Sequence, residues 1–408
     1  MCSVTAVAEL TSVEDALDLV LARVRPLPAE PVALADAAGR VLAEDAVAAI
    51  DLPRFASSAM DGFALRSADT PGRLPVVARV AAGRPAGRAL APGEAMAIST
   101  GGVVPEGADA VVPIELVRDE GETVDVPQAA PAGANVRPRG GDVGAGDVVV
   151  AAGVPLTPSR LAALASSGVV TLRCAARPTV AIVSTGTELR RPGETLREGE
   201  IYESNGLMLA ALLAGAGAIV RPPEHVEDDP RAHEEALARG LEADVLVSSG
   251  GVSVGPHDLV RDTLGRLGVE EALWGVAMRP GKPLSFGARN GTLVFGLPGN
   301  PVSSLVGALL FLLPALRALE GRLHPEPPFA TGSLAAPASR RPSRDDFQRA
   351  SLERTADGVT LRPLSGQDSH MIARAAAADA LVHIPRGSGE LPAGSAVRYL
   401  LLDGSAGA

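Results

Sequence analysis

The chain has few of the residue types that mark several protein classes. Among its 408 residues there are only two cysteines, Cys2 and Cys174, so there is no CxxC pair and no disulfide framework. We therefore expect a reducing, cytoplasmic setting. Basic residues number 37 against 48 acidic ones, and the net charge of −11 comes with no basic stripe. This balance argues against a nucleic-acid partner.

Long hydrophobic runs are also lacking. The longest, 305–316, is interrupted by Pro314 and is shorter than the roughly 20 residues that a membrane-spanning helix needs. Acidic residues at Glu9, Glu14 and Asp15 make the N-terminal segment unlike a secretory signal. Hydrophobic residues make up 46% and charged residues 21% of the chain, which is typical of a soluble globular protein without a membrane partner. The length suits two to four domains.

Lysine is almost absent. Lys282 is the only lysine among the 37 basic residues, and it lies in a Pro-Gly-Lys-Pro turn. Drift toward arginine in a GC-rich genome explains the arginines, but it does not explain the one lysine that remains. Lysine is a compact point charge with three donors, whereas arginine is a rigid planar fork. We interpret Lys282 as a functional residue.

The rest of the chain is organised around the stretch 245–304, which has three glycine-rich turns. These turns lie at 248–255, 279–283 and 297–304; two of them follow apolar runs at 245–247 and 292–295 and lead into helical patterns at 259–267 and 305–319. Strand, glycine loop and helix in this order predict an open α/β sheet, which binds ligands at the carboxyl ends of its strands. Free N–H groups at a helix start favour anions, so the sequence predicts a phosphate-like site.

The remaining patterns predict further domains around this sheet. Helices are expected over 11–25, where Thr11 to Glu14 reads as a capping box, and over 159–167, 206–214 and 230–240. The expected domains are a discontinuous helical and linking domain at 1–26 and 147–176, an inserted mostly-β domain at 27–146, the α/β domain at 177–324 and a small β-domain at 325–408. Pro- and Gly-rich turns between short apolar runs favour β structure in the insert and after 325.

Several acidic residues fall near the predicted loops. Glu188 follows a strand pattern at 180–183, and Asp258 precedes a helix. Together with a phosphate cradle they could hold Mg²⁺, which takes oxygen ligands. An N-cap role alone could also account for Asp258, and Asp61 could belong to an ordinary Asx-Gly turn. The six histidines show no zinc spacing.

Longer motifs then give a recognisable pattern. They are Ser-Ala-Met-Asp-Gly-Phe at 58–63, Thr-Gly-Gly through Ala-Asp-Ala-Val-Val at 100–112, Ser-Thr-Gly-Thr-Glu-Leu at 184–189, Ser-Gly-Gly-Val-Ser-Val-Gly at 249–255, Pro-Gly-Lys-Pro at 280–283 and Leu-Pro-Gly-Asn-Pro-Val-Ser-Ser at 297–304. The chain resembles the MoeA family over nearly its whole length. Members of that family are molybdopterin molybdenumtransferases, related to the C-terminal region of gephyrin.

The resemblance implies both a fold and a reaction. It implies an elongated, four-domain homodimer with an α/β domain similar to the MoaB and MogA proteins, an inserted mostly-β domain and a small C-terminal β-domain. The implied reaction takes adenylylated molybdopterin and molybdate, inserts molybdenum, releases AMP and is assisted by Mg²⁺. The implied active site lies between the α/β domain of one subunit and the β regions of the other, and the pathway's adenylyltransferase is an implied partner.

Site residues carry over by position. The resemblance places molybdate at Arg279, Lys282, Ser303, Arg349 and Ser369. It associates activity with Asp61, Thr100, Asp142, Glu188, Asp228, Asp258 and Lys282, of which Glu188 and Asp258 are the expected metal ligands. The expected molybdopterin or nucleotide site comprises Ser184, Thr185, Gly186, Ser204, Asn205, Ser249, Gly250, Gly251, Ser253, Gly255, Pro298, Gly299 and Asn300.

The sequence also departs from the family pattern at five positions. Thr187 stands where aspartate is usual, Arg279 where lysine is common, and Gly102 where alanine is usual. Phe63 replaces a usual tyrosine, and Asp379 replaces a common asparagine. Arg279 keeps the positive charge but offers a fork instead of a point. Asp379 adds negative charge near the expected oxyanion pocket.

Two other functions remain open at this stage. One is an adenylyltransferase that activates molybdopterin with ATP, because its α/β domain would look much alike. The other is a non-catalytic scaffold. The two β regions and the matches at Arg349 and Ser369 favour molybdenum insertion. The sequence does not distinguish molybdate from tungstate.

Overall fold

A computed structural model describes residues 10–251, 259–356 and 358–403. The expected site residues Ser253, Gly255 and Asp258 lie outside these ranges. The chain divides into two compact units. The first comprises 1–30, 39–43 and 174–408, and the second comprises 31–38 and 44–173. The finer division into four domains stays a prediction.

The α/β sheet of the first unit has seven strands. Its order is β16 (Ile219–Val220), β13 (Thr179–Thr185), β18 (Val245–Ser249), β22 (Thr292–Leu297), β21 (Ser285–Arg289) and β19 (Glu270–Trp274), with β17 (Glu224–Val226) also beside β13. β13, β18 and β22 run parallel, whereas β21 runs antiparallel to both of its neighbours, β22 and β19. The predicted parallel strands are therefore confirmed, and their carboxyl ends meet at one edge of the sheet.

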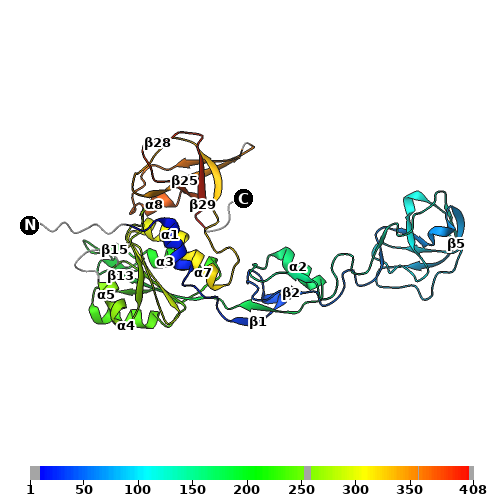
Figure 1. Ribbon diagram of the computed structural model, residues 1–408, viewed down its shortest axis with the longest axis horizontal. Coiled ribbons are helices and arrows are strands. Elements are labelled where there is room, and N and C mark those ends of the chain that lie inside the picture. The colour runs from blue at the N-terminus through cyan, green and yellow to red at the C-terminus, as the bar shows by residue number, and fades with distance from the viewer. Residues whose placement is uncertain (1–9, 252–258, 357, 404–408) are drawn as a thin grey trace, which may run out of the picture. The chain divides into compact units, whose positions relative to one another are not determined.

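Apolar side chains that point alternately to the two faces of the strands form a hydrophobic core on each face of this sheet. Val245 and Val247 pack with one group of helices, whereas Leu246 between them packs with the other. The first group contains α1 (Val13–Leu21), α3 (Asn205–Gly215) and the 301–319 helix; the second contains α4 (Pro230–Gly240) and α5 (Leu259–Arg266). Figure 1 shows the two groups on opposite sides of the strands. Strands buried on both faces explain the continuous apolar runs of the sequence.

The helix boundaries sharpen the predicted pattern. α4 matches its prediction, and α3 extends the predicted helix by one residue at each end. α1 ends at Leu21, which is shorter than predicted, and its N-cap is Ser12, whose side chain accepts from the Asp15 amide. The capping therefore lies one residue later than the Thr11 to Glu14 pattern suggested.

The most apolar segment forms one continuous helical stretch through Pro314. It comprises α6 (Pro301–Gly307), a π-helical segment (Ala308–Leu312) and α7 (Leu313–Leu319). A π segment relieves the clash that a proline makes with the preceding turn. By length and composition alone the 19-residue stretch could cross a membrane, so the expectation that this segment is too short was wrong, whereas the helix predicted over 305–319 is confirmed and begins four residues earlier. However, 89% of its most apolar window is buried inside the protein, as in a core helix.

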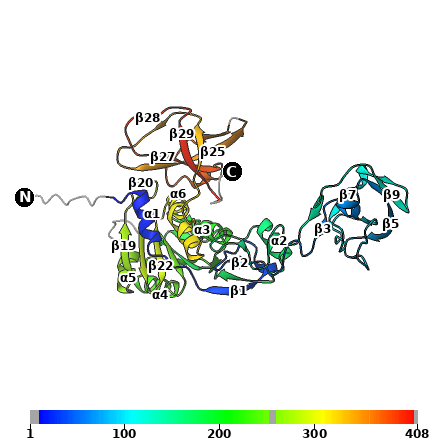
Figure 2. The same cartoon turned by 45° about the vertical axis from the view of Figure 1, so that its right-hand side comes forward.

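The C-terminal part of the first unit is a small barrel-like β-domain, as predicted. Its strands are β20 (Met278–Arg279), β23 (Ala330–Leu334), β25 (Asp345–Thr355), β26 (Gly358–Pro363), β27 (Ala380–Ile384) and β29 (Ala396–Leu401), with a short pair of β24 (Ala338–Ser339) and β28 (Glu390–Leu391) and helix α8 (Ile372–Ala375). β25 pairs with β27 and so closes the sheet (Figure 2). β20 comes from the α/β region and pairs with β25, which joins the two parts.

The second unit contains the expected β structure. A six-stranded sheet has the order β7 (Ala110–Pro113), β4 (Gly62–Leu65), β6 (Ala95–Ile98), β5 (Gly72–Val80), β9 (Thr123–Val126) and β8 (Arg118–Asp119). Further elements are β2 (Ala46–Val47), β3 (Ser57–Ser58), β10 (Val136–Arg137), β11 (Val148–Val150) and α2 (Pro158–Ser166). Gly62 is required by a close approach of strands, because a Cβ there would lie 2.0 Å from the Val112 carbonyl oxygen of β7.

Candidate functional site

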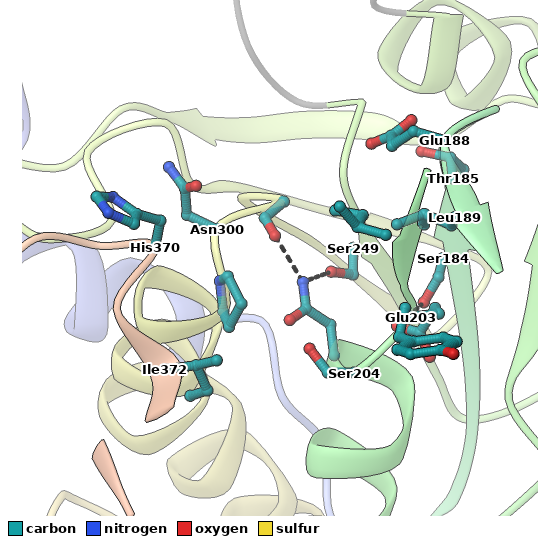
Figure 3. Close-up of a pocket in the computed structure, with 15 residues that line it drawn as sticks. Ser184, Thr185, Glu188, Leu189, Glu203, Ser204, Ser249, Asn300, His370 and Ile372 are labelled. Carbon is teal, nitrogen blue, oxygen red and sulfur yellow. Dashed lines mark hydrogen bonds between the residues drawn. The ribbon is translucent and has the colours of Figure 1, made fainter. Parts of the chain in front are cut away.

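A pocket of about 520 Å³ lies at the carboxyl ends of the parallel strands (Figure 3). Its walls are Ser184, Thr185, Glu188, Leu189, Ile201, Tyr202, Glu203, Ser204, Asn205, Ser249, Gly299, Asn300, Pro301, His370 and Ile372. The first two residues end β13, Ser249 ends β18, and Gly299 follows β22. Seven of the residues expected to bind molybdopterin or nucleotide therefore come together, as does Glu188. This is the place where an open α/β sheet binds its ligand.

Asn205, the first residue of α3, lies at the centre of this pocket. Its side chain is buried, and its Nδ2 donates to Ser249 Oγ at 2.8 Å and to the Gly299 carbonyl at 2.7 Å. The carbonyl can only accept, so this orientation of the amide is fixed. Within the described residues, Oδ1 has no hydrogen-bond partner. A buried acceptor without a partner is costly, so this atom calls for a donor from a ligand or from water.

Glu203 supports the same wall. Its Oε1 accepts from Ser184 Oγ at 3.0 Å and from the Gly206 amide at 2.7 Å. The carboxylate therefore ties the end of β13 to the first turn of α3, where Ser204 makes no capping bond of its own. Sequence reasoning missed Glu203. The one local signal was an acidic residue three positions before an amide at a predicted helix start.

Glycines let the loops approach one another at the strand ends. Gly250 has φ +93°, and a Cβ there would lie 2.8 Å from the Thr185 carbonyl oxygen. Gly251 has φ +64°, and a Cβ there would lie 2.4 Å from Val260. Both backbone conformations strongly favour glycine. This explains the Gly-Gly pair after β18 without any ligand, and it also brings that loop against β13.

The residues expected to bind molybdate gather beside the start of the 301–319 helix. Gly281 lies against Ser303, since a Cβ there would be 3.5 Å from the Ser303 carbonyl oxygen, and the Val302 amide donates to the Ser369 carbonyl at 3.1 Å. The structure thus brings together the Pro-Gly-Lys-Pro turn, Ser303 and Ser369. Lys282 is exposed, and in the part of the chain that the structure describes it has no ion pair.

Arg279 differs from Lys282 in its electrostatic surroundings. Its guanidinium lies 3.7 Å from a carboxylate oxygen of Asp346 and 3.6 Å from one of Asp368. The Asp346 side chain is buried, whereas that of Asp368 is exposed. Two carboxylates therefore share the charge of Arg279. Among the described residues, Lys282 contributes the positive charge of this cluster that no carboxylate compensates.

Arg349, on β25, is fully buried and holds the turn at 366–371. Its Nη1 donates to the Met371 carbonyl, and its Nη2 donates to the carbonyls of Gly366 at 2.7 Å and Asp368 at 3.2 Å. Burial, and then the neighbouring Arg374, lowers the pKa of Arg349. Its Nε has no partner among the described residues. The Nε–H of the guanidinium is thus left for an acceptor.

The second unit holds the other three predicted residues. Asp61 and Thr100 come together, because Asp61 Oδ1 accepts from the Thr100 amide at 2.7 Å. This contact joins residues far apart in the sequence, so it is not the bond of a local Asx turn. Asp142 lies elsewhere in this unit, in a pocket of about 470 Å³ that it shares with Leu52 and Arg137. All three side chains of the predicted set are exposed.

Asp228 and the departure at Thr187 form a pair. Asp228 Oδ2 accepts from Thr187 Oγ1 at 2.9 Å. The usual aspartate at position 187 would put two carboxylates in contact, whereas the threonine hydroxyl donates to Asp228. Asp379, another departure, accepts from the Leu352 amide at 2.9 Å, so its carboxylate has a structural role in the C-terminal domain.

The oxygen donors at the pocket suit a hard cation. Glu188 and Glu203 both line the pocket, and Ser184 lies between them in the wall. Mg²⁺ prefers such oxygens and usually takes only one or two carboxylates together with substrate phosphates. Across the described ranges, no group of three or more His, Cys, Asp or Glu side chains forms a metal cage. The donors therefore fit an ion that arrives with a phosphate.

Comparison with known proteins gives the same assignment along the whole chain. Residues 11–168 match the MoeA N-terminal region (domain I and II), 181–318 match a probable molybdopterin binding domain, and 331–402 match the MoeA C-terminal region (domain IV). The chain is 38% identical to molybdopterin molybdenumtransferase 2 of Mycobacterium tuberculosis over 95% of this chain and 98% of that protein. It is 31% identical to the molybdopterin molybdenumtransferase of Staphylococcus aureus, over 97% and 96%.

A solved structure extends the likeness to the fold. The molybdopterin biosynthesis MoeA protein of Pyrococcus horikoshii matches with a TM-score of 0.84 and 30% identity, over 96% of this chain and 100% of that one. Three consecutive family regions, full-length relatives above 30% identity and a matching fold agree. The chain belongs to the MoeA family.

Proposed function

We propose that this chain is a molybdopterin molybdenumtransferase. In the proposed reaction, adenylylated molybdopterin and molybdate give molybdenum-loaded molybdopterin and AMP. The observation that carries the proposal is the juxtaposition of two different sites in one unit. A polar pocket rich in hydroxyls and amides lies at the strand ends, and a cationic cluster lies at the start of the 301–319 helix. The turn at 366–371 contributes to both.

The pocket would bind the pterin and nucleotide parts of the substrate. Asn205 Oδ1 is an acceptor that awaits a donor, and Ser249 and Ser204 line the same wall. Such neutral groups fix orientation at a low cost in desolvation. Once the substrate lies there, its dithiolene sulfurs bind the molybdenum, so no protein nucleophile is required.

The cationic cluster would hold molybdate, a tetrahedral dianion. Lys282 supplies the uncompensated charge, and Arg279 adds a fork whose charge is shared with Asp346 and Asp368. The unpaired Nε of Arg349 supplies one further donor. Fixed charges and donors of this kind stabilise an oxyanion without reorganisation during the reaction.

Mg²⁺ is part of the proposal. Glu188, at the rim of the pocket, would hold it, together with Asp258, which lies outside the described residues. When bound, the ion would neutralise charge on the phosphate as the adenylate leaves. We also propose a homodimer in which Asp61, Thr100 and Asp142 of one subunit complete the site of the other, handover from an adenylyltransferase, and a cytoplasmic location.

The experiment that tests the function is a reaction with defined substrates. The purified chain should release AMP from adenylylated molybdopterin when molybdate and Mg²⁺ are present, and it should not need ATP. Pyrophosphate release from ATP and molybdopterin, without that AMP release, would instead identify an adenylyltransferase. No turnover in either reaction, from a folded protein, would favour a scaffold.

A further inference from the structure

The turn at 186–188, which carries Glu188, is tied to the neighbouring strand β17. His225 Nε2 lies 2.9 Å from the Gly186 carbonyl oxygen. Since a carbonyl only accepts, this nitrogen carries the ring proton and donates it. The Gly186 amide in turn donates to the Val226 carbonyl at 3.2 Å. These two bonds fix the start of the turn through its backbone.

Asp228 adds the side-chain tie at the middle of the turn. Its Oδ2 accepts from Thr187 Oγ1 at 2.9 Å and from the Thr187 amide at 3.3 Å. In the described residues, both hydrogen bonds that Asp228 accepts come from this one residue. Asp228 is not a wall of the pocket, whereas Glu188, the next residue after Thr187, is one.

His233 lies beside the other carboxylate oxygen of Asp228. Its Nε2 lies 3.8 Å from Asp228 Oδ1, and its ring is 1% exposed. Neither ring nitrogen has a hydrogen-bond partner within the described part of the chain. Burial lowers the pKa of His233, against the opposing effect of Asp228 and Asp229. At 3.8 Å the ring is too far from Asp228 for a hydrogen bond, so Thr187 is the donor that the carboxylate engages.

The backbone leaves the turn little freedom. Gly186 is buried with φ +153°, and a Cβ there would lie 2.6 Å from a carboxylate oxygen of Glu188. The Glu188 side chain thus folds back over Gly186, at the rim of the pocket beside Thr185 (Figure 3). Moving Thr187 would move Glu188 with it, because the two residues share a peptide bond.

We propose that Asp228 is a positioning residue that acts through Thr187. It holds Glu188 at the rim of the pocket with an acceptor oxygen, and neither its charge nor contact with substrate is required. The inference rests on the proposed function, because Glu188 is taken to serve that reaction. It assigns Asp228 a role different from the catalytic one that the resemblance implied.

Four variants test whether Asp228 acts through its acceptor oxygen or through its negative charge. Asp228→Ala and Thr187→Val each remove the hydroxyl–carboxylate bond and should lower the rate of AMP release about tenfold. Asp228→Asn keeps an acceptor oxygen of the same shape and should lose less than about threefold. Thr187→Ser keeps the hydroxyl and is the matched control. If Asp228→Asn is as damaging as Asp228→Ala, the charge is required and the proposal is overturned.

Hydrogen exchange gives a readout that does not depend on turnover. The Thr187 amide donates to Asp228 and the Leu189 amide donates to the Gly186 carbonyl, so both should exchange faster in Asp228→Ala and Thr187→Val but not in Asp228→Asn. The Ile182 amide, in the middle of β13, reports global destabilisation and should stay protected in all variants. If these amides exchange at the same rate in Asp228→Ala as in the wild type, Asp228 does not hold the turn and the proposal is refuted. A wild-type chain that releases no AMP would refute the proposed function and leave this exchange result standing.

Discussion

The polar pocket and the cationic cluster differ in how they could recognise a ligand. The pocket presents hydroxyls, two amides and two glutamates, and its centre is Asn205, a buried neutral side chain whose Oδ1 has no partner among the described residues. The cluster presents Lys282 and Arg279, which are charged and less buried. One region selects by hydrogen-bond pattern and shape, whereas the other selects by charge. This difference indicates which kind of ligand each region suits. An uncharged ring system fits the polar pocket, and an inorganic dianion fits the cationic cluster.

Lys282 should give the largest effect if the cluster works by charge. Lys282→Ala should lower AMP release in the presence of molybdate by about a hundredfold or more, which is the usual cost of losing an oxyanion donor. Because Lys282 is exposed, thermal stability should stay unchanged. Lys282→Arg keeps the charge and is the matched variant, with a smaller loss expected. Full activity of Lys282→Ala would contradict the comparison of the two regions, because the cluster would then not depend on the charge of Lys282.

Asn205 should give the next largest effect, and on the other ligand. Asn205→Ala removes the free acceptor and should weaken AMP binding about tenfold, measured by calorimetry. The half-saturating molybdate concentration should change much less. If AMP binding stays intact and only the melting temperature falls, Asn205 merely ties α3 to Ser249 and Gly299.

Ionic strength should separate the two regions without any substitution. Raising the salt concentration from about 50 to 500 mM shortens the screening length severalfold. The half-saturating molybdate concentration should then rise by about threefold to tenfold, since Lys282 is exposed. Binding of adenosine, which lacks the charged phosphate of AMP, should respond less, because the hydroxyls and amides of the pocket are neutral. Equal salt sensitivity of the two ligands would contradict the assignment of charge to one region.

His233 should give the smallest effect, on stability alone. Burial lowers the pKa of His233 in the folded state, so the unfolded chain binds the proton more readily. Stability from this group is therefore complete above the ordinary histidine pKa of about 6.5 and is lost as the pH falls toward the lowered folded-state pKa. His233→Leu should flatten the acid side of the unfolding free energy measured in urea, with little change at neutral pH.

The exposed His324 gives the matched control for this measurement. His324→Leu should keep the acid sensitivity of the wild type. If His233→Leu also keeps it, another group causes the loss of stability in acid. Activity at neutral pH should be retained in both variants, which separates this effect from those in the pocket and the cluster.

Much of the fold could be predicted from local patterns. The apolar runs at 245–247 and 292–295, each followed by glycine turns, predicted the parallel strands and the edge where the pocket lies. Such signals are local, because strand burial and turn conformation are properties of neighbouring residues. The end of α1 was missed, because tertiary packing decides it, and the helix predicted over 305–319 begins four residues earlier, at Pro301.

Contacts between distant segments could not be read from the sequence alone. His370 and Ile372 line the pocket from the C-terminal domain, and no local pattern marks them. The two carboxylates beside Arg279 come from a strand and a turn that follow it by many residues. The roles of the predicted site residues stay predictions, although the structure gathers many of those in the first unit at the pocket and at the start of the 301–319 helix.

The 301–319 helix has a consequence for how the chain is made. α1 packs against the π-helical segment and α7, which are synthesised about 300 residues later. At about 5–20 residues per second, the first helix waits on the order of 15–60 seconds for its partner. During that delay the whole second unit emerges and can fold by itself. The first unit is then closed late, by its most apolar segment, which makes the ribosome-bound intermediate the form of this protein that most needs protection from aggregation.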